Sequence, residues 1–384
     1  MTTEKRPLQI FVLIDALGWE VLKGRGFLED LLTYRRPLRT VLGFSSGAIP
    51  TMLTGRAPSE TGHWNLYYYD PKGSPFRWLK YFRFLPDRFL DSRVSRKIVK
   101  ELGRRFLGMG PLFECCVSPR WLPDFNWVEK KNIYAAGGIS GAPSIFDDLT
   151  ALDIPHRVYT YHEAGDEEIL RAARFDIEVG EAGFFFLYLS ELDAVLHFHP
   201  SGGEELESRM AWYERELRRL FGLAKQVDPR ATLTVLSDHG MAPVTERFDL
   251  VQEVENLGFR FGKDYLAIYD STMARFWFFS DAAREAICGC LGKLTCARVL
   301  DDEELKKLGI FFPDRRYGEA IVLLNPGWLI ARSDFNGAGW NPQGMHGYHP
   351  DDPFSDAIYL SNHVPPVAVH GIADVYECMQ KAMK

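Results

Sequence analysis

The sequence predicts an α/β fold with a mostly parallel central sheet flanked by helices. Three apolar runs, at residues 8–14, 184–189 and 232–236, have the length and composition of strands that are buried on both faces. Between the second and third runs, residues 204–227 place large apolar side chains at helical spacing among many charges, as an amphipathic crossover helix does. A strand, a helix and a further strand in this order are typical of a parallel sheet.

Length and composition indicate a globular protein with a sizeable core. The chain has 384 residues, of which 46% are hydrophobic and 14% aromatic, and this length suits two or three domains or one large α/β domain that carries insertions. Lys and Arg number 45 against 52 Asp and Glu, so the formal net charge is −7. This balance argues against a nucleic acid polymer as the partner.

The N-terminal apolar run and the cysteines indicate the cellular compartment of the protein. The run that ends at Leu17 is interrupted by Asp15, which makes it too short for a membrane span and wrongly flanked for a signal peptide. The six cysteines show neither a disulfide framework nor paired zinc-ligand spacing. We therefore expect reduced thiols and a cytoplasmic protein.

Two segments interrupt the expected α/β core, which comprises residues 1–65, 135–257 and 341–384. Residues 66–134 form a basic and aromatic cap insertion, with eleven Lys or Arg against three acidic residues between Lys72 and Arg105. Such a segment could clamp an anionic substrate or touch a lipid or membrane surface, but its aromatic side chains could equally face a core.

The second segment, residues 258–340, is expected to be a smaller α+β insertion. Its strand patterns lie at residues 274–279 and 320–324, and residues 301–308 have the charge pattern of a helix.

Acidic residues follow each of the three apolar strands, and histidines lie close to two of them. Because the carboxyl ends of parallel strands meet at one edge of a sheet, we expect these side chains to converge. Carboxylate oxygens and imidazole nitrogens suit divalent ions such as Zn²⁺ or Mn²⁺. Two such ions roughly 3.5–4 Å apart can clamp an in-line displacement at phosphorus or sulfur. The candidate ligands are Asp15, Asp193, His197, Asp238, His239 and His346.

A nucleophile is available just before a helical pattern. Ser45 and Ser46 lie between two glycines and precede the apolar residues 48–53. A hydroxyl at a helix N-terminus is also the usual N-cap, so a structural role for either serine remains open.

Taken together, these motifs resemble the alkaline phosphatase superfamily, and within it the type I phosphodiesterase and nucleotide pyrophosphatase branch. The resemblance extends over residues 15–347 and is carried by Asp15 after its strand, Ser45 nine residues before Thr54-Gly55, Asp193-x-x-x-His197, Ser-Asp238-His239-Gly240 and Gly344-Met-His346-Gly347. It implies an alkaline phosphatase-like fold and an enzyme that hydrolyses small-molecule phosphate esters.

The resemblance also implies roles for the individual residues. Asp15, Ser45, Asp238 and His239 would surround one zinc ion, and Asp193, His197 and His346 would hold the other. Ser45 would attack phosphorus to give a covalent intermediate, which water activated at the second ion would then hydrolyse.

Three features depart from the family pattern. The Asn that holds a phosphoryl oxygen in the family aligns with Leu66, so a one-residue shift is needed to assign this role to Asn65. Gly47 replaces the usual Pro, which leaves Ser46 as a rival nucleophile. His199 and His349 lie close to the favoured histidines, although the spacing supports His197 and His346.

Several related functions are weighed against this prediction. A sulfatase would need a Pro and an Arg at set positions just after the nucleophile, and residues 45–49 contain neither. A cofactor-independent phosphoglycerate mutase would need a longer insertion. A phosphomonoesterase and a non-catalytic binding protein on the same fold both remain open. A diesterase needs a pocket for the second ester arm, for which Trp64 and residues 67–69 are candidates.

Overall fold

The large sheet contains six strands in the order β2-β16-β7-β1-β6-β5. The structure, a computed structural model, describes residues 6–109, 113–335 and 340–383. Strands β5, β6, β1 and β7 are parallel, whereas β16 runs antiparallel to both β7 and β2, which confirms the mostly parallel sheet. The strands are β1 Gln9–Ile14, β2 Tyr34–Leu38, β5 His156–Tyr159, β6 Phe184–Leu189, β7 Thr232–Leu236 and β16 Ala357–Ser361.

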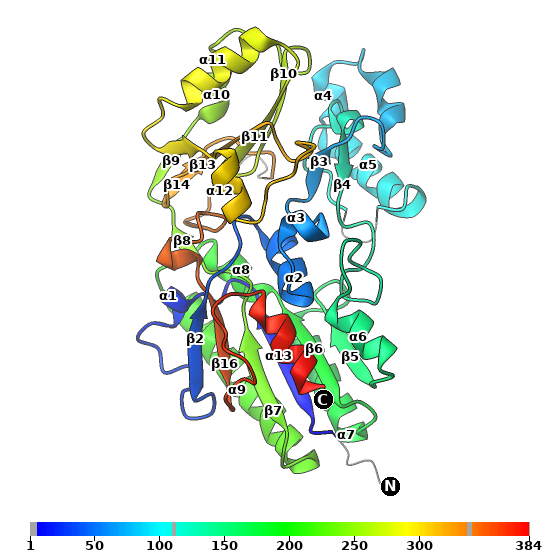
Figure 1. Ribbon diagram of the computed structural model, residues 1–384, viewed down its shortest axis with the longest axis vertical. Helices are drawn as coiled ribbons and strands as arrows, with labels where there is room; N and C mark the ends of the chain where they lie inside the picture. The colour runs from blue at the N-terminus through cyan, green and yellow to red at the C-terminus, as the bar shows by residue number, and fades with distance from the viewer. Residues whose placement is uncertain (1–5, 110–112, 336–339, 384) are drawn as a thin grey trace.

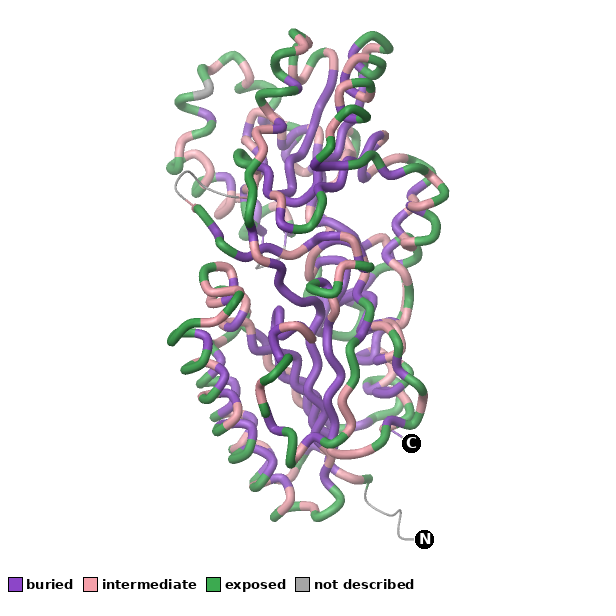
Figure 2. Tube along the Cα trace, turned by 90° about the vertical axis from the view of Figure 1, so that its left-hand side faces the viewer, coloured by how far each residue is buried: buried purple, intermediate pink, exposed green. Residues whose placement is uncertain are grey.

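Helices cover both faces of this sheet, because alternate residues of its central strands point to opposite sides. Ile10 and Val12 of β1 pack into one apolar cluster, and Phe11 and Leu13 pack into another. The first cluster is closed by α1 Trp19–Leu22, α7 Asp166–Val179 and α9 Glu204–Val227, and the second by α2 Ser45–Thr54, α6 Ile145–Ala151 and α13 Asp374–Ala382. Strands β1, β6 and β16 are buried over their whole length, and Figure 2 shows a mainly purple trace through the lower half of the molecule.

The cap and the second insertion lie together at the end of the molecule opposite the N-terminus (Figure 1). The cap consists of β3 Tyr67–Tyr69, η1 Arg77–Phe82, α4 Asp87–Leu90, α5 Arg93–Phe106, η2 Leu122–Asp124 and β4 Phe125–Trp127. The second insertion contains the antiparallel sheet β10 Tyr265–Tyr269, β11 Met273–Phe278, β13 Ala320–Leu324 and β12 Ala297–Val299, with α11 Asp281–Leu291 and α12 Asp302–Lys307.

Short elements connect this end of the molecule to the large sheet. They are α3 Pro58–Thr61, α8 Glu191–Leu196, β8 Ala242–Pro243, β9 Glu246–Phe248, α10 Leu250–Glu255, β14 Trp328–Ile330, β15 Gly344–Met345 and η3 Pro353–Ser355. Leu250 and Val254 of α10 pack in the apolar cluster of the second insertion. Helix α10 thus packs with the second insertion, and the expected domain bounds stay a prediction.

The aromatic side chains of the cap divide between a core and the surface. Tyr67 and Trp127 pack with Trp277 of β11 in one apolar cluster, so the cap and the second insertion share a core. In contrast, Tyr81 and Phe84 are 81% and 80% exposed.

A buried ion pair adds to the joint between the cap and the second insertion. The Arg275 guanidinium lies 2.5 Å from the Asp270 carboxylate and also donates to the carbonyl oxygen of Tyr67, at 2.8 Å.

Within the described residues, no helix is long and apolar enough to cross a membrane. Contact of the cap with a membrane surface stays a prediction.

Candidate metal centre and nucleophile

Two glycines bring the loops after β1 and β7 together. Asp15 follows β1 directly, and Asp238 is the second residue after β7. A Cβ atom on Gly18 would lie 2.5 Å from the Cα atom of Gly240, so the two loops touch backbone to backbone. Only glycine allows this approach, and it holds Asp15 and Asp238 side by side.

A second set of backbone contacts brings His197 and His346 together. The short helix α8 places Asp193 and His197 one turn apart. Strand β15 pairs with β8, which sets His346 beside the loop that carries His239. The backbone N–H of Gly344 donates to the carbonyl oxygen of His197 at 3.0 Å, which joins the two histidine-bearing segments.

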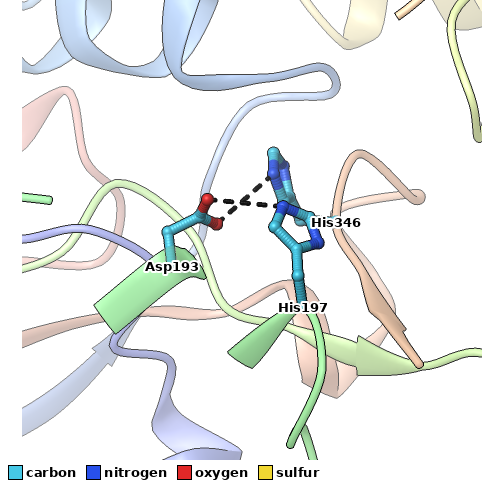
Figure 3. A group of neighbouring side chains, drawn as sticks. All are labelled: Asp193, His197 and His346. Atoms are coloured by element: carbon cyan, nitrogen blue, oxygen red, sulfur yellow. Dashed lines mark ion pairs between the residues drawn. The ribbon is translucent and has the colours of Figure 1, made fainter. Parts of the chain in front are cut away.

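The candidate ligands form two adjacent groups of three, in each of which the ligand atoms lie within 4.8 Å of one another. In the first group, His239 Nε2 lies 3.6 Å from Asp15 Oδ1 and 3.3 Å from Asp238 Oδ2. In the second, Asp193 faces His197 Nε2 at 3.3 Å and His346 Nε2 at 3.6 Å (Figure 3). The His239 and His346 rings stack with centroids 3.9 Å apart, so the groups adjoin.

Two of the imidazoles are oriented by backbone carbonyls. His197 Nδ1 lies 2.9 Å from the carbonyl oxygen of Gly344, and His239 Nδ1 lies 3.0 Å from that of Gly240. In each case Nδ1–H donates, which leaves the Nε2 lone pair directed at the carboxylates. This arrangement is common for histidines that bind metals, because it fixes both the tautomer and the ring.

The carboxylates of the two groups have the properties of metal ligands. Asp15 Oδ1, Asp193 Oδ1 and Asp238 Oδ2 are buried and accept no hydrogen bond from the described residues. Burial raises the pKa of Asp15, and the neighbouring Asp238 and Asp193 raise it further. Buried anionic oxygens of this kind are costly unless a cation compensates them. The donor set therefore fits two divalent cations.

In the second group, the carboxylate and the imidazoles shift one another's pKa values. Burial alone would raise the pKa of Asp193, but its interactions with His197 and with the imidazoles of His346 and His239 outweigh burial and hold that pKa below its usual range. Burial would lower the pKa of His197, and the Asp193 carboxylate raises it above its usual value instead. Burial lowers the pKa of His346.

The two candidate nucleophiles differ in what their hydroxyls contact. Ser45, the first residue of α2, has its Oγ atom 3.1 Å from His239 Nε2. The hydroxyl of Ser46 instead donates to the carbonyl oxygen of Trp64 at 2.9 Å. Gly47 also packs on Trp64, whose carbonyl oxygen would lie 3.0 Å from a Cβ at that position. Only the Ser45 hydroxyl faces a ligand group.

The structure also shows the surroundings of Asn65, His199 and His349. Asn65 is buried in the wall of a cavity that also contains His197 and His346, and its amide nitrogen lies 3.8 Å from Met273 Sδ. His199 faces Glu205 and His349 faces Glu304 and Asp351, so neither belongs to a ligand group.

Two cavities open beside the nucleophile, and both contain Phe44, Ser46 and Leu66. The larger, of about 250 Å³, is mainly apolar and is completed by Asn65, His197, Ser271, Phe335, Trp340, Met345 and His346. The smaller, of about 190 Å³, is completed by Ser45, Ile49, Glu129, Ile133, Tyr134, Tyr161, His162 and Tyr188.

The expectation about aromatic pocket residues needs correction. Trp64 and residues 67–69 line neither cavity beside Ser45. Trp64 instead packs against Gly43 and Gly47. The aromatic lining comes from residues that the sequence analysis did not single out. Of these, Tyr188 lies in an apolar strand, and its phenol donates to Asp15 Oδ2 at 2.5 Å. A tyrosine hydroxyl inside a strand buried on both faces could have signalled a polar partner.

Three solved structures share this fold at low sequence identity. Murine ectonucleotide pyrophosphatase/phosphodiesterase 5 superposes with a TM-score of 0.67 at 15% identity, covering 98% of this chain and 94% of that one. The human protein gives 0.68 at 14% identity, with the same coverage. An inactive variant of the murine protein in complex with AMP gives 0.66 at 15% identity, covering 99% and 95%.

Sequence comparison identifies the family directly. No curated protein sequence matches the chain. The family model for type I phosphodiesterase/nucleotide pyrophosphatase matches residues 10–349, a range that contains both ligand groups and Ser45. The chain therefore belongs to the type I phosphodiesterase/nucleotide pyrophosphatase family and is a phosphodiesterase-like hydrolase.

Proposed function

We propose that this hydrolase cleaves small phosphodiesters with Ser45 as the nucleophile and two divalent cations, preferably Zn²⁺. The observation that carries the proposal is the position of Ser45 Oγ, 3.1 Å from His239 Nε2 at the junction of the two ligand groups. Asp15, Asp238 and His239 would hold one cation together with Ser45, and Asp193, His197 and His346 the other. The AMP complex of the murine relative supports a small phosphate ester as the substrate class.

The bound cations would supply Lewis acid chemistry that polarises the phosphoryl group and lowers the pKa of coordinated hydroxyls. The residues of the chain would position the reactants. Ser45 lies at the N-terminus of the ten-residue helix α2, where backbone N–H groups favour a developing negative charge. Asn65, in the wall of the larger cavity, would donate to a non-bridging oxygen.

The reaction would proceed in two displacements. The bond from Ser45 Oγ to phosphorus forms as the bond to the first alcohol breaks; the serine releases its proton and the departing alcohol takes one up. Water then replaces the serine oxygen, which restores Ser45 and releases a phosphomonoester. Two in-line steps predict net retention at phosphorus.

The two cavities favour a diester over a monoester. A diester has two arms, and the cavities beside Ser45 provide one space for each. His197 and His346 line the larger cavity, which Ser45 does not line. Because the leaving group of an in-line displacement departs opposite the nucleophile, we assign the departing alcohol to this cavity. The smaller cavity contains Ser45 itself, so it would hold the arm that stays on phosphorus.

The experiment compares hydrolysis of bis(p-nitrophenyl) phosphate, p-nitrophenyl phosphate and p-nitrophenyl sulfate by wild type, Ser45→Ala and Ser46→Ala. We expect the diester to be the best substrate, Ser45→Ala to lose at least about 10³-fold in kcat, and Ser46→Ala to stay within about tenfold of wild type. Full activity of Ser45→Ala would reject the nucleophile, and faster turnover of the monoester would favour a phosphomonoesterase.

Metal analysis separates the enzyme from a non-catalytic binding protein. Purified protein supplied with Zn²⁺ should hold about two ions per chain, and chelation should abolish activity until metal is restored. Absence of bound metal after supplementation would support the non-catalytic alternative.

A further inference from the structure

The smaller cavity contains a carboxyl group that the proposed reaction does not use. Glu129 follows β4 and is only 8% exposed, and the indole of Trp127 donates to its backbone carbonyl oxygen at 3.0 Å. No described side chain donates a hydrogen bond to its carboxylate or forms an ion pair with it. The neighbouring Lys131 points elsewhere, to the carbonyl oxygen of Gly137 at 3.1 Å. A buried carboxylate without a partner is costly unless an occupant of the cavity supplies one.

Three tyrosine rings line the same cavity as this carboxyl group. The Tyr161 and Tyr188 rings meet edge to face with centroids 5.0 Å apart, and Tyr134 lies 5.8 Å from Tyr188. Burial lowers the pKa of His162 to about 4, so this imidazole is neutral near pH 7 and adds no positive charge to the cavity. Aromatic faces together with one carboxylate are the features that recognise organic cations.

The size of the cavity limits the occupant. Its volume of about 190 Å³ is below the roughly 300–1,000 Å³ of cavities that hold drug-sized ligands. A compact alkylammonium group on a short arm suits it better than a nucleoside does.

We propose that Glu129, Tyr134 and Tyr161 form a binding site for an organic ammonium group, so that the substrate is a phosphodiester whose retained arm ends in a cation. This inference rests on the proposed function, because it assigns an occupant to the cavity on the Ser45 side. The phosphomonoester product then keeps the ammonium group, and the alcohol that leaves through the larger, apolar cavity does not need one.

The test uses two esters of equal shape that differ only in charge: p-nitrophenyl phosphorylcholine and p-nitrophenyl 3,3-dimethylbutyl phosphate, in which carbon replaces the ammonium nitrogen. Wild type should prefer the cationic ester by about tenfold or more in kcat/KM. Glu129→Gln should bring that ratio close to one. Glu163→Gln, which removes an exposed carboxylate of the next loop outside the cavity, should leave the ratio as in wild type.

Ligand binding to the Ser45→Ala variant tests the cation site independently of catalytic turnover. Calorimetric titration with phosphorylcholine and with 3,3-dimethylbutyl phosphate should show the same preference for the cation, and the preference should disappear in Ser45→Ala/Glu129→Gln. Preferential binding without hydrolysis of any ester by wild type would reject the proposed function and retain the cation site.

Other outcomes would overturn the cation site alone. One is hydrolysis of both esters by wild type with a ratio near one, and another is an unchanged preference in Glu129→Gln. Tenfold faster turnover of thymidine 5′-(p-nitrophenyl phosphate) than of p-nitrophenyl phosphorylcholine would assign the cavity to a nucleoside instead.

Discussion

Glu129→Gln should make the protein more stable at alkaline pH, although the carboxyl group lies in a proposed binding site. Burial raises the pKa of Glu129 to about 7, against 4.5 for an exposed glutamate. At about 1.4 kcal/mol for each pKa unit, holding this side chain charged costs the folded protein about 3 kcal/mol. A neutral glutamine of the same shape avoids that cost.

The pH dependence has a definite sign. The folded protein binds the Glu129 proton more tightly than the unfolded chain does, so the side chain costs nothing below pH 4.5. Its cost grows as the pH rises from 4.5 to about 7 and is complete above that value. The difference in unfolding free energy between Glu129→Gln and wild type should therefore rise from near zero at pH 4.5 to about 3 kcal/mol at pH 8.5.

Thermal melts followed by circular dichroism at both pH values would measure the effect. An unfolding entropy of about 2.1 cal/mol/K per residue converts 3 kcal/mol into a gain of about 4 °C for a chain of this length. Glu163→Gln serves as the matched control, because it removes the same charge from an exposed position. Melting temperatures of wild type and Glu129→Gln that stay equal from pH 4.5 to 8.5 would refute the reasoning.

Three further perturbations probe the ligand groups and the joint between the insertions. Tyr188→Phe removes the phenol that donates to Asp15, so metal affinity should fall by about tenfold in a chelator competition; unchanged affinity would argue against Asp15 as a ligand. Arg275→Met leaves the Asp270 carboxylate buried and unpaired, and should cost about 3–5 kcal/mol in urea denaturation, part of which Arg275→Met/Asp270→Asn should recover. Chelation should lower the melting temperature, because cations present at about 1,000 times their Kd stabilise the fold by about 4 kcal/mol per site; a melting temperature indifferent to chelation would indicate that neither group binds an ion.

The parts of the fold that could be predicted are those in which the local pattern and the tertiary packing agree. Strand β6 and helix α9 begin and end where the apolar run and the helical spacing indicate. Both are long and strongly patterned, and each is buried on the faces that its pattern demands. Strand β2 gives a weaker signal, because Tyr34–Leu38 contains two arginines and an exposed proline and lies at the edge of the sheet.

The ligand groups could be located because their residues follow recognisable strands. Asp15 and Asp238 occupy the carboxyl ends of parallel strands, where convergence follows from topology alone. The lining of the smaller cavity had no such signal. Glu129 and Tyr161 come from irregular loops without periodicity, and they meet only because the cap returns toward the sheet. The roles of Ser45, Asn65 and the ligands stay predictions until the variants are measured.

The order of the ligands along the polypeptide has a consequence for synthesis. The first ligand candidate is residue 15 and the last is residue 346, which reaches its neighbours through the pairing of β15 with β8. A nascent chain that has left the ribosome only as far as β7 already possesses β1 and β6, yet it lacks His346. If His346 is a ligand as proposed, full loading with metal would await translation beyond residue 346, and metal content would distinguish chains that extend past this residue from chains terminated before it.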